Sequence, residues 1–234
     1  MQSEKKNYQL LKKFALEKTG ISLLGVAEVG SLKDSFRDIS LSVREKFSLA
    51  ISIAVRLLDP VIEDIEDHPT ALYVHHYRQV NYWLDRASLA ISGFIQSREW
   101  RALPIPASQI IDWNNLTGHL SHWEIAWRAG LGWRGRNNLL VHPRLGSRIR
   151  LASILTDFPL QVDSPLKRDC GDCRRCIPVC PVGAIKEDPE EFDLEACQGQ
   201  IRLFKKKYNL PHYVCGICVK ACGGTHSDGE KRTN

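Results

Sequence analysis

Apolar positions in the first two thirds of the chain follow helical and strand periods in turn. Residues 4–19 carry apolar side chains at helical spacing, and Gly20 behind them is a typical helix stop. Residues 21–29 are predicted to form a short buried strand, and the polar segment 31–45 a surface loop. Residues 47–57 alternate large apolar with small side chains, which is the clearest strand pattern in the chain.

A second group of elements follows the breaking pair Asp59-Pro60. Residues 61–67 fit one or two helical turns, and Thr70 is placed to cap a long helix that runs to about Arg98. Three further strands are predicted at residues 100–105, 138–142 and 149–158. Helices and strands alternate without an internal repeat, so the expected fold class is an α/β or α+β sandwich.

Composition limits the class of protein. With 43% apolar residues, the 234-residue chain can bury one substantial core plus a small appended module. Its apolar runs are far shorter than a membrane span, which predicts a protein with no membrane association. Residues 1–13 are polar and lack the apolar core of a secretion signal, so we expect a cytoplasmic location.

The eight cysteines give the strongest chemical signal, because all of them lie in the last 65 residues. Residues 170–181 read C-G-D-C-R-R-C-I-P-V-C-P and match the bacterial ferredoxin run C-x2-C-x2-C-x3-C-P. In that run three thiolates bind one iron–sulfur cluster and the fourth binds another. Cys215, Cys218 and Cys222 repeat the two spacings, and Cys197 lies between the groups.

Ferredoxin precedent therefore predicts two 4Fe–4S clusters. The predicted ligands of cluster one are Cys170, Cys173, Cys176 and Cys222. The predicted ligands of cluster two are Cys180, Cys197, Cys215 and Cys218. A pair of zinc knuckles is the alternative, but tetrahedral zinc needs neither the third cysteine of the run nor C-x3-C-P. A disulfide framework is disfavoured because no secretion signal is present.

The cysteine distribution also predicts the domain organisation. We expect an α/β cofactor and substrate domain at 1–162, a double-cluster ferredoxin-like domain at 163–223 and a flexible tail at 224–234. The second domain is too small and polar to fold without its metal. The formal charge of +5 falls to roughly +1 if each cluster contributes about −2. Net charge is therefore weak evidence for nucleic-acid binding.

A glycine-rich loop needs separate treatment. Its glycines spell the dinucleotide fingerprint G-x-G-x-x-G: Gly130, Gly132 and Gly135. That fingerprint requires a strand before it and a helix after it, whereas here the capping box Ser121–Glu124 starts a helix before it and a strand follows. The glycines are better explained by close backbone approach, either to a packed neighbour or to a flat cofactor. Arg134 and Arg136 could hold an anionic group or simply be solvated.

Two histidine pairs are candidate metal ligands, but a structural or substrate-contact role is favoured for both. His75 and His76 point to different faces of a helix and cannot serve one site. His119 and His122 share a face, but the capping box places them at a first helical turn.

The string A-G-L-G-W-R-G-R-N-N-L-L-V-H-P-R-L-G-S at 129–147, followed by L-T-D-F-P-L at 155–160 and the cysteine module, resembles the epoxyqueuosine reductase family. It is also similar to the related corrinoid-dependent reductive dehalogenases, and the resemblance runs from about Leu23 to Cys222. It implies a nitroreductase-like, cobalamin-handling first domain that carries a ferredoxin-like module. It also implies that the clusters pass electrons to a low-valent cobalt, which reduces the substrate.

The resemblance implies cofactors and partners. Cobalamin, or else flavin, is expected at the glycine-rich loop, whose candidate residues are Gly130, Gly132, Trp133, Arg134, Gly135, Arg136 and Asn137. Electrons are expected from an external donor such as flavodoxin or ferredoxin. Lys205, Lys206 and Lys207 are interpreted either as the docking patch for an acidic donor or as a solvated helix face.

Two departures from the family bear on the substrate. The tRNA-modifying members carry a helical-repeat extension after the clusters, and this chain is expected to be a short form without it. Their proton-donating aspartate, in a D-S-A-P motif, falls in register near Leu116. The candidate proton donors here are instead Asp112, His119 and His122. A tRNA substrate is thus weakly supported.

Three functions follow from these observations. The leading prediction is an iron–sulfur oxidoreductase resembling epoxyqueuosine reductase, which relays electrons to a corrinoid or flavin site. The alternatives are a non-catalytic electron carrier and a protein that reactivates the corrinoid of another protein. All three require the cysteine module to bind clusters.

Overall fold

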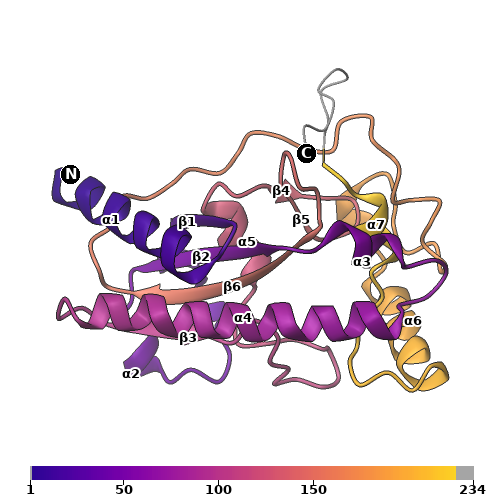
Figure 1. Cartoon of the computed structure of the whole chain (residues 1–234), viewed down its shortest axis with the longest axis horizontal. Helices are drawn as coiled ribbons and strands as arrows, with labels where there is room; N and C mark the ends of the chain where they lie inside the picture. The colour runs from indigo at the N-terminus through magenta and orange to yellow at the C-terminus, as the bar shows by residue number, and fades with distance from the viewer. Residues whose placement is uncertain (1, 225–234) are drawn as a thin grey trace. The chain divides into compact units, whose positions relative to one another are not determined.

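The computed structural model of the chain describes residues 2–224 (Figure 1). It divides into two compact units. The sheet unit comprises the chain up to Arg56, Gln79–Leu131 and Arg150–Leu166. The cysteine unit comprises Leu57–Arg78, Gly132–Ile149 and the chain from Lys167 onward. The predicted boundary at residue 162 stays a prediction, and the predicted tail lies outside the described residues except for Gly224.

The sheet unit contains a four-stranded sheet in the order β1 (Leu23–Glu28), β2 (Leu49–Arg56), β6 (Ile149–Thr156), β3 (Ala102–Ile105). The β1–β2 pair is antiparallel with Val26 opposite Ile51, and the β3–β6 pair is antiparallel with Pro104 opposite Ile154. Proline is tolerated in β3 because this strand lies at the edge of the sheet.

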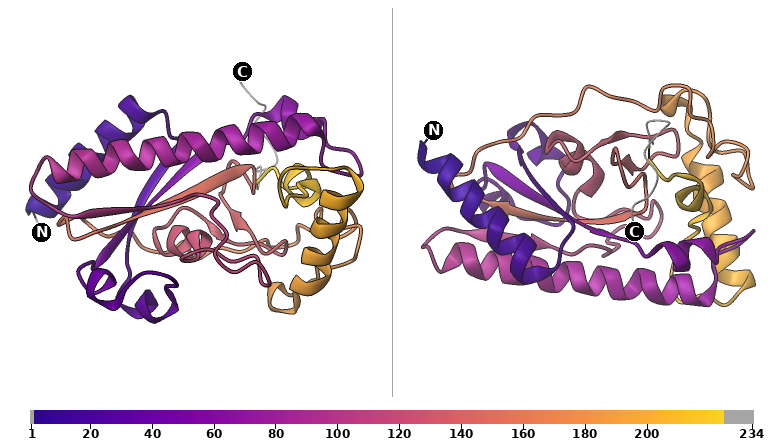
Figure 2. Two further views of the ribbon diagram at one scale, coloured as in Figure 1. Left: turned by 90° about the horizontal axis from the view of Figure 1, so that it is seen from below. Right: turned by 45° about the horizontal axis from the view of Figure 1, so that its top comes forward.

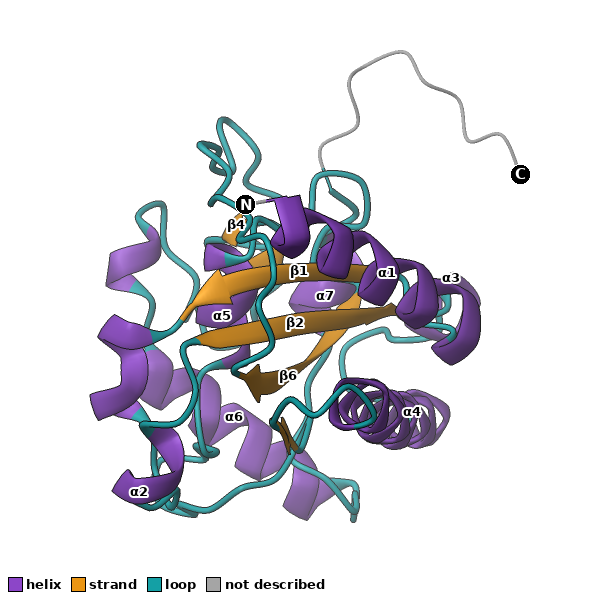
Figure 3. Cartoon of the chain, turned by 90° about the vertical axis from the view of Figure 1, so that its left-hand side faces the viewer, coloured by secondary structure: helices purple, strands orange, loops and turns teal. Residues whose placement is uncertain are grey.

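Strand β2 is the centre of the sheet unit. Every residue of β2 except Arg56 is buried, because its large side chains alternate with alanine and serine that let elements pack closely. Helices α1 (Gln2–Thr19) and α4 (Ala71–Gln96) lie on one side of the strands and α5 (His122–Arg128) on the other (Figures 2 and 3). The mixed α/β class predicted from the sequence is confirmed, with antiparallel strand pairs.

Local sequence signals mark where these helices begin and end, as expected. Gly20 follows α1 with φ +70°, and Gly130 follows α5 with φ +70°, a conformation that glycine adopts without strain. The hydroxyl of Thr70 accepts a hydrogen bond from Tyr73 N at 3.2 Å at the start of α4. The hydroxyl of Ser121 accepts one from Glu124 N at 3.3 Å, which confirms the capping position.

Residues 31–45 differ from the predicted surface loop. They contain most of a 3-10 helix, η1 (Gly30–Ser35), and a short helix, α2 (Leu41–Arg44). Leu32 and Phe36 are buried in one cluster with Phe47 and Ile125. The few apolar residues of this polar segment therefore hold it against the core of the sheet unit. The sequence pattern did not predict this, because polar and charged residues surround them.

The cysteine unit has little regular structure. It holds α3 (Asp59–Glu63), the two-residue strands β4 (Trp133–Arg134) and β5 (Leu140–Val141), and, from residue 167 onward, three helical segments. Those three are η2 (Pro189–Glu191), α6 (Leu194–Lys207) and α7 (Ile217–Ala221). Helix α3 begins at Asp59, because proline is accepted in a first helical turn. None of the helices in residues 2–224 is long and apolar enough to span a membrane.

Candidate metal centre

The cysteines lie on tight turns and short helices of the cysteine unit. Successive turns are closed by hydrogen bonds from Cys173 N to Cys170 O at 3.0 Å and from Cys180 N to Ile177 O at 3.3 Å. Gly216, with φ +87°, lies between Cys215 and the start of α7. A Cβ atom added to Gly216 would lie 2.6 Å from the Tyr73 ring. These turns hold the thiols on closely spaced, irregular backbone, as cluster ligands require.

The electrostatic neighbours of Cys176 are the cysteines predicted to share its cluster. Burial raises the pKa of the Cys176 thiol to about 11, and the charges of Cys222, Cys170 and Cys173 add to the rise. Cys222 lies 46 residues further along the chain, yet it is the strongest of the three charged neighbours. The first predicted set is therefore gathered around Cys176.

The second predicted set behaves in the same way. Burial raises the pKa of Cys215 to about 11, with contributions from Cys197 and Cys180. Burial likewise raises the pKa of Cys218 well above its usual value, and its first charged neighbours are Cys215 and Cys197. Cys176 also acts on Cys218, so the two sets lie near each other within the cysteine unit.

This donor set fits iron–sulfur clusters. Burial and neighbouring thiols raise the pKa values of Cys176, Cys215 and Cys218, and iron binding removes that cost by replacing the protons. Within residues 2–224, no three His, Cys, Asp or Glu side chains are placed closely enough to hold one metal ion. A 4Fe–4S cluster spreads its four thiolates over four irons, so its ligand set is wider than that of one tetrahedral zinc ion.

Arginines surround the first set. Burial acts to raise the pKa of Cys173, but hydrogen bonds from the backbone and side chain of Arg175, with the charges of Arg175 and Arg136, lower it below its usual value. Arg175 also donates to Gly224 O at 2.9 Å. In the second set, burial raises the pKa of Cys197, and the negative charges of Cys180 and Asp193 add to the rise. The two sets therefore have different electrostatic surroundings.

The glycine-rich loop is a tight hairpin between β4 and β5. A Cβ atom on Gly132 would meet Val141 O at 2.3 Å, and one on Gly135 would meet Val141 Cγ2 at 2.5 Å. A Cβ on Gly130, in the sheet unit, would meet Ser164 O at 2.6 Å. All three glycines thus pack against their own chain, the first of the two explanations offered above, and helix α5 precedes the hairpin as expected.

The polar residues of this hairpin bond to the cysteine unit. Arg136 donates to Cys173 O and Gly171 O, each at 3.0 Å, and Arg134 donates to Glu190 Oε1 at 2.6 Å. Asn137 is buried and donates to Ser147 Oγ at 2.9 Å. The indole Nε1 of Trp133 is buried without a hydrogen-bond partner among the described residues.

Asp112 is held as a carboxylate. Its Oδ2 accepts from Asn115 Nδ2 at 2.8 Å and from Arg37 Nη1 at 3.2 Å, and its Oδ1 accepts from the backbone N of Asn114 and Asn115. The Asn115 side-chain bond is the largest cause of its lowered pKa, followed by the Asn115 backbone bond. A carboxyl group held in this way is a poor proton donor.

His122 is held neutral. Burial lowers its pKa to about 4. Its Nε2 lies 3.0 Å from Pro106 O, which can only accept, so Nε2 carries the hydrogen and Nδ1 accepts from Ser153 Oγ at 2.9 Å. The ring of the partly exposed His119 contacts Arg37 O at 3.1 Å and Gln109 Oε1 at 3.3 Å. The three candidates thus lie in one unit, and both ring nitrogens of His119, like those of His122, lie within hydrogen-bond distance of other protein atoms.

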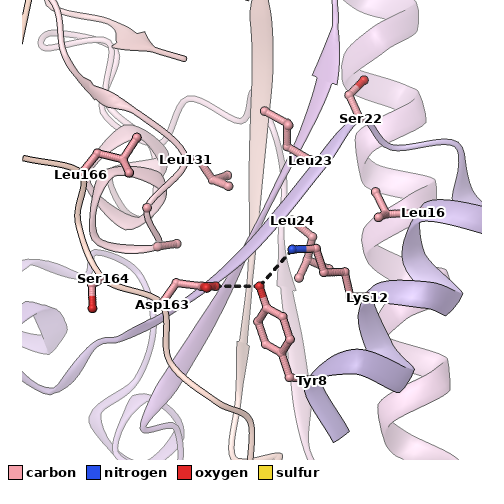
Figure 4. A pocket seen from close by; sticks show the side chains of 12 residues that line it. Tyr8, Lys12, Leu16, Ser22, Leu23, Leu24, Leu131, Asp163, Ser164 and Leu166 are labelled. Carbon is pink, nitrogen blue, oxygen red and sulfur yellow. Dashed lines mark hydrogen bonds between the residues drawn. The ribbon is translucent and has the colours of Figure 1, made fainter. Parts of the chain in front are cut away.

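A separate pocket of about 350 Å³ lies in the sheet unit (Figure 4). Tyr8 donates to Asp163 Oδ2 at 2.9 Å and accepts from Lys12 Nζ at 3.3 Å. Asp163 Oδ2 also accepts from Val26 N at 2.9 Å, so the pair ties α1 to the edge strand β1. Burial, then the bond to Asp163, raises the pKa of Tyr8. Sequence reasoning missed this network, because Tyr8 and Asp163 are 155 residues apart.

Comparison with curated proteins identifies the relatives of this chain. It is 44% identical over 113 residues to the epoxyqueuosine reductase of Listeria monocytogenes, covering 45% of this chain and 30% of the relative. It is 34% identical over 180 residues to that of Synechococcus sp., covering 70% of this chain and 52% of the relative. This chain is a relative of the epoxyqueuosine reductases. The predicted resemblance is confirmed, and the alignments span about a third to a half of these reductases. No protein-family model matches the chain.

Solved structures of epoxyqueuosine reductases and dehalogenases share the fold. The epoxyqueuosine reductase of Streptococcus thermophilus has a TM-score of 0.61 at 23% identity and covers 92% of this chain and 65% of its own. A reductive dehalogenase described as B12-dependent has a TM-score of 0.74 at 18% identity, covering 94% and 32%. A third relative, an epoxyqueuosine reductase bound to a tRNA stem loop, has a TM-score of 0.61 at 20% identity, covering 94% and 67%.

Proposed function

We propose that the chain is an iron–sulfur oxidoreductase similar to epoxyqueuosine reductase. It would relay electrons through two 4Fe–4S clusters in a ferredoxin-like module to a corrinoid or flavin. The observation that carries this proposal is that eight thiols lie together in the cysteine unit, where Cys222, Cys170 and Cys173 act on Cys176, and Cys197 and Cys180 act on Cys215. A cluster supplies one-electron transfer, which amino-acid side chains cannot sustain.

The residues divide into named roles under this proposal. Cluster one is held by Cys170, Cys173, Cys176 and Cys222. Cluster two is held by Cys180, Cys197, Cys215 and Cys218. Trp133 Nε1 is the proposed donor to the organic cofactor, and the partly exposed His119 is the proposed source of the proton, since Asp112 is held as a carboxylate and burial lowers the pKa of His122.

The substrate and the cofactor follow from the relatives. An epoxyqueuosine reductase that binds a tRNA stem loop supports a modified tRNA as substrate, and the B12-dependent dehalogenase supports a corrinoid as the preferred cofactor. Cobalamin added to protein purified without air should shift the visible spectrum of the corrinoid, and flavin serves as the competing ligand. Turnover of epoxyqueuosine-containing tRNA, lost on changing His119 to Gln, would support the assigned proton donor.

The electron donor is proposed to dock on helix α6. Arg202, Lys205 and Lys206 line a pocket with Tyr213, and the Lys205 ammonium lies 4.9 Å from the centre of that ring. Lys205 also donates to Leu210 O, and the exposed Lys206 and Lys207 next to it are the cations proposed to meet an acidic flavodoxin or ferredoxin. Lys206→Glu should slow reduction by such a donor, most strongly at low salt.

Cysteine pairs offer a decisive test of the clusters. Protein purified without air should contain about eight irons and eight sulfides per chain. Changing Cys176 and Cys222 together to Ser should remove about four irons, because both belong to set one. Changing Cys180 and Cys222 together should remove nearly all iron, because each set then loses a ligand. Zinc in place of iron, or equal losses in the two double variants, would refute the assignment.

A further inference from the structure

The guanidinium of Arg136 reaches from the β4–β5 hairpin to the loop that carries the first three cysteines. It donates three hydrogen bonds to backbone carbonyls: to Glu187 O at 2.8 Å, Cys173 O at 3.0 Å and Gly171 O at 3.0 Å. Its side chain is only 13% exposed. A planar fork that satisfies three carbonyls from one position fixes the path of the loop more firmly than a single bond can.

The hairpin that carries Arg136 is itself fixed. Gly135 N donates to Leu139 O at 2.8 Å and Asn138 N donates to Gly135 O at 2.9 Å. Asn138 adopts φ +56°, and the buried Asn137 next to Arg136 bonds to Ser147. The backbone on either side of Arg136 therefore has little freedom, and the guanidinium is held in place from both ends.

The charge of Arg136 is not fully neutralised. Glu187 Oε2 lies 3.6 Å from Arg136 Nε, but the same carboxylate binds Arg174 Nε at 2.6 Å. Two arginines share this carboxylate, and Asp172 also acts on Arg174, so Glu187 alone does not neutralise both guanidinium groups beside the cysteine loop. Arg175 adds a second cation at this loop, where it bonds to Gly224 O.

We propose that Arg136 is a positioning residue for cluster one, which shapes the Cys170–Cys176 loop and raises the reduction potential of that cluster relative to cluster two. This inference rests on the proposed iron–sulfur function. Reduction adds one negative charge to a cluster, and a fixed cation nearby favours the reduced state. Electrons would then pass from cluster two to cluster one.

Redox titration of the full chain, followed by low-temperature magnetic resonance, tests this inference. Arg136→Gln should lower the reduced-to-oxidised ratio of cluster one about tenfold at a fixed solution potential, a shift of about 59 mV for a one-electron couple. The potential of cluster two should stay unchanged. Arg136→Lys, which keeps the charge but not the fork, should keep the potential and lose iron faster to a chelator.

Arg134→Gln is the matched control, because Arg134 is a second arginine on the same hairpin and donates to Asn138 Oδ1 and Glu190 Oε1. It should leave the potential of cluster one unchanged. Equal shifts in both clusters, or no shift in Arg136→Gln, would overturn the inference. If Arg136→Gln does not retain cluster one, Arg136→Lys provides the test. Selective loss of iron from cluster one would support the positioning role of Arg136, and equal loss of iron from both clusters would refute it. Wild-type protein without iron would instead defeat the proposed function.

Discussion

In the sheet unit, large apolar side chains are removed from water, whereas in the cysteine unit the long loops are tied by charged side chains. Of the twelve largest fully buried side chains, nine lie in the sheet unit and three, Leu57, Ile62 and Ile65, lie in the first segment of the cysteine unit, while none lies between Lys167 and Gly224. In the cysteine unit, Arg148 donates to Asp59 and to Lys220 O, and Lys220 Nζ donates to Glu63 O. Burial can specify the first unit alone, but hydrogen bonds contribute too little net free energy to specify the second.

The largest expected effect comes from removing the metal. Chelation of iron should abolish the amide protection of residues 167–222, while β2 and α4 keep theirs, because residues 167–222 contribute none of the largest fully buried side chains and depend on the metal to hold their loops together. Hydrogen exchange with mass spectrometry measures both regions in one sample. Equal loss of protection in β2 would show that the two units unfold together and would contradict the comparison.

A buried β2 side chain should be the next most costly change. Ile53→Ala removes a fully buried side chain and should lower the free energy of unfolding of the sheet unit by about 2–5 kcal/mol. Urea denaturation followed by circular dichroism measures the loss. Leu89→Ala, at a side chain on α4 that is 63% exposed, is the control and should change stability by less than about 0.5 kcal/mol. Similar costs at the two sites would argue against a packed core around β2.

Acid should weaken the sheet unit through His122. The pKa of His122 is about 4 in the folded protein and 6.5 in the unfolded chain. Between pH 6.5 and pH 4, therefore, only the unfolded chain gains a proton at His122. The contribution of His122 to the stability of the folded sheet unit is thus complete above pH 6.5 and is lost as the pH falls from 6.5 toward 4. The shift corresponds to roughly 3 kcal/mol for a fully shielded ring, and we expect about 2 kcal/mol because His122 is partly exposed. His122→Gln should flatten the pH dependence of unfolding, whereas His119→Gln should not.

The smallest predicted effect concerns the Tyr8–Asp163 pair. Tyr8→Phe should cost about 1 kcal/mol, and Asp163→Asn about 1–3 kcal/mol because Asp163 also accepts from Val26 N. A double-mutant cycle should show a coupling energy above about 0.5 kcal/mol. Asp34→Asn, at a fully exposed side chain, is the matched control. Additive effects would mean that the hydrogen bond does not hold α1 to β1.

The sequence predicts the local elements of the molecule well, but not the contacts between residues that are far apart in the chain. Strand β2 and helix α4 were predicted within two residues of their ends, because their apolar periods and caps are local. The cysteine pairing, which rests on ferredoxin precedent, stays a prediction. The Arg136 bonds, the tautomer of His122 and the Tyr8–Asp163 contact join residues 16 to 155 positions apart, and no local pattern reports them. The pair Arg174-Arg175 inside the cysteine run was the one visible sign of the cations at set one.

The turn at Gly146 limits how the cysteine module can be transplanted. Gly146 has φ +59°, a methyl group there would strike Cys222 O at 2.1 Å, and Ser147 N bonds to the same oxygen at 3.3 Å. A fragment that starts at Lys167 would omit this turn, together with Arg136 and Arg148. We therefore expect a chimaeric ferredoxin built from this protein to assemble only when it also carries the hairpin and turn of residues 132–149.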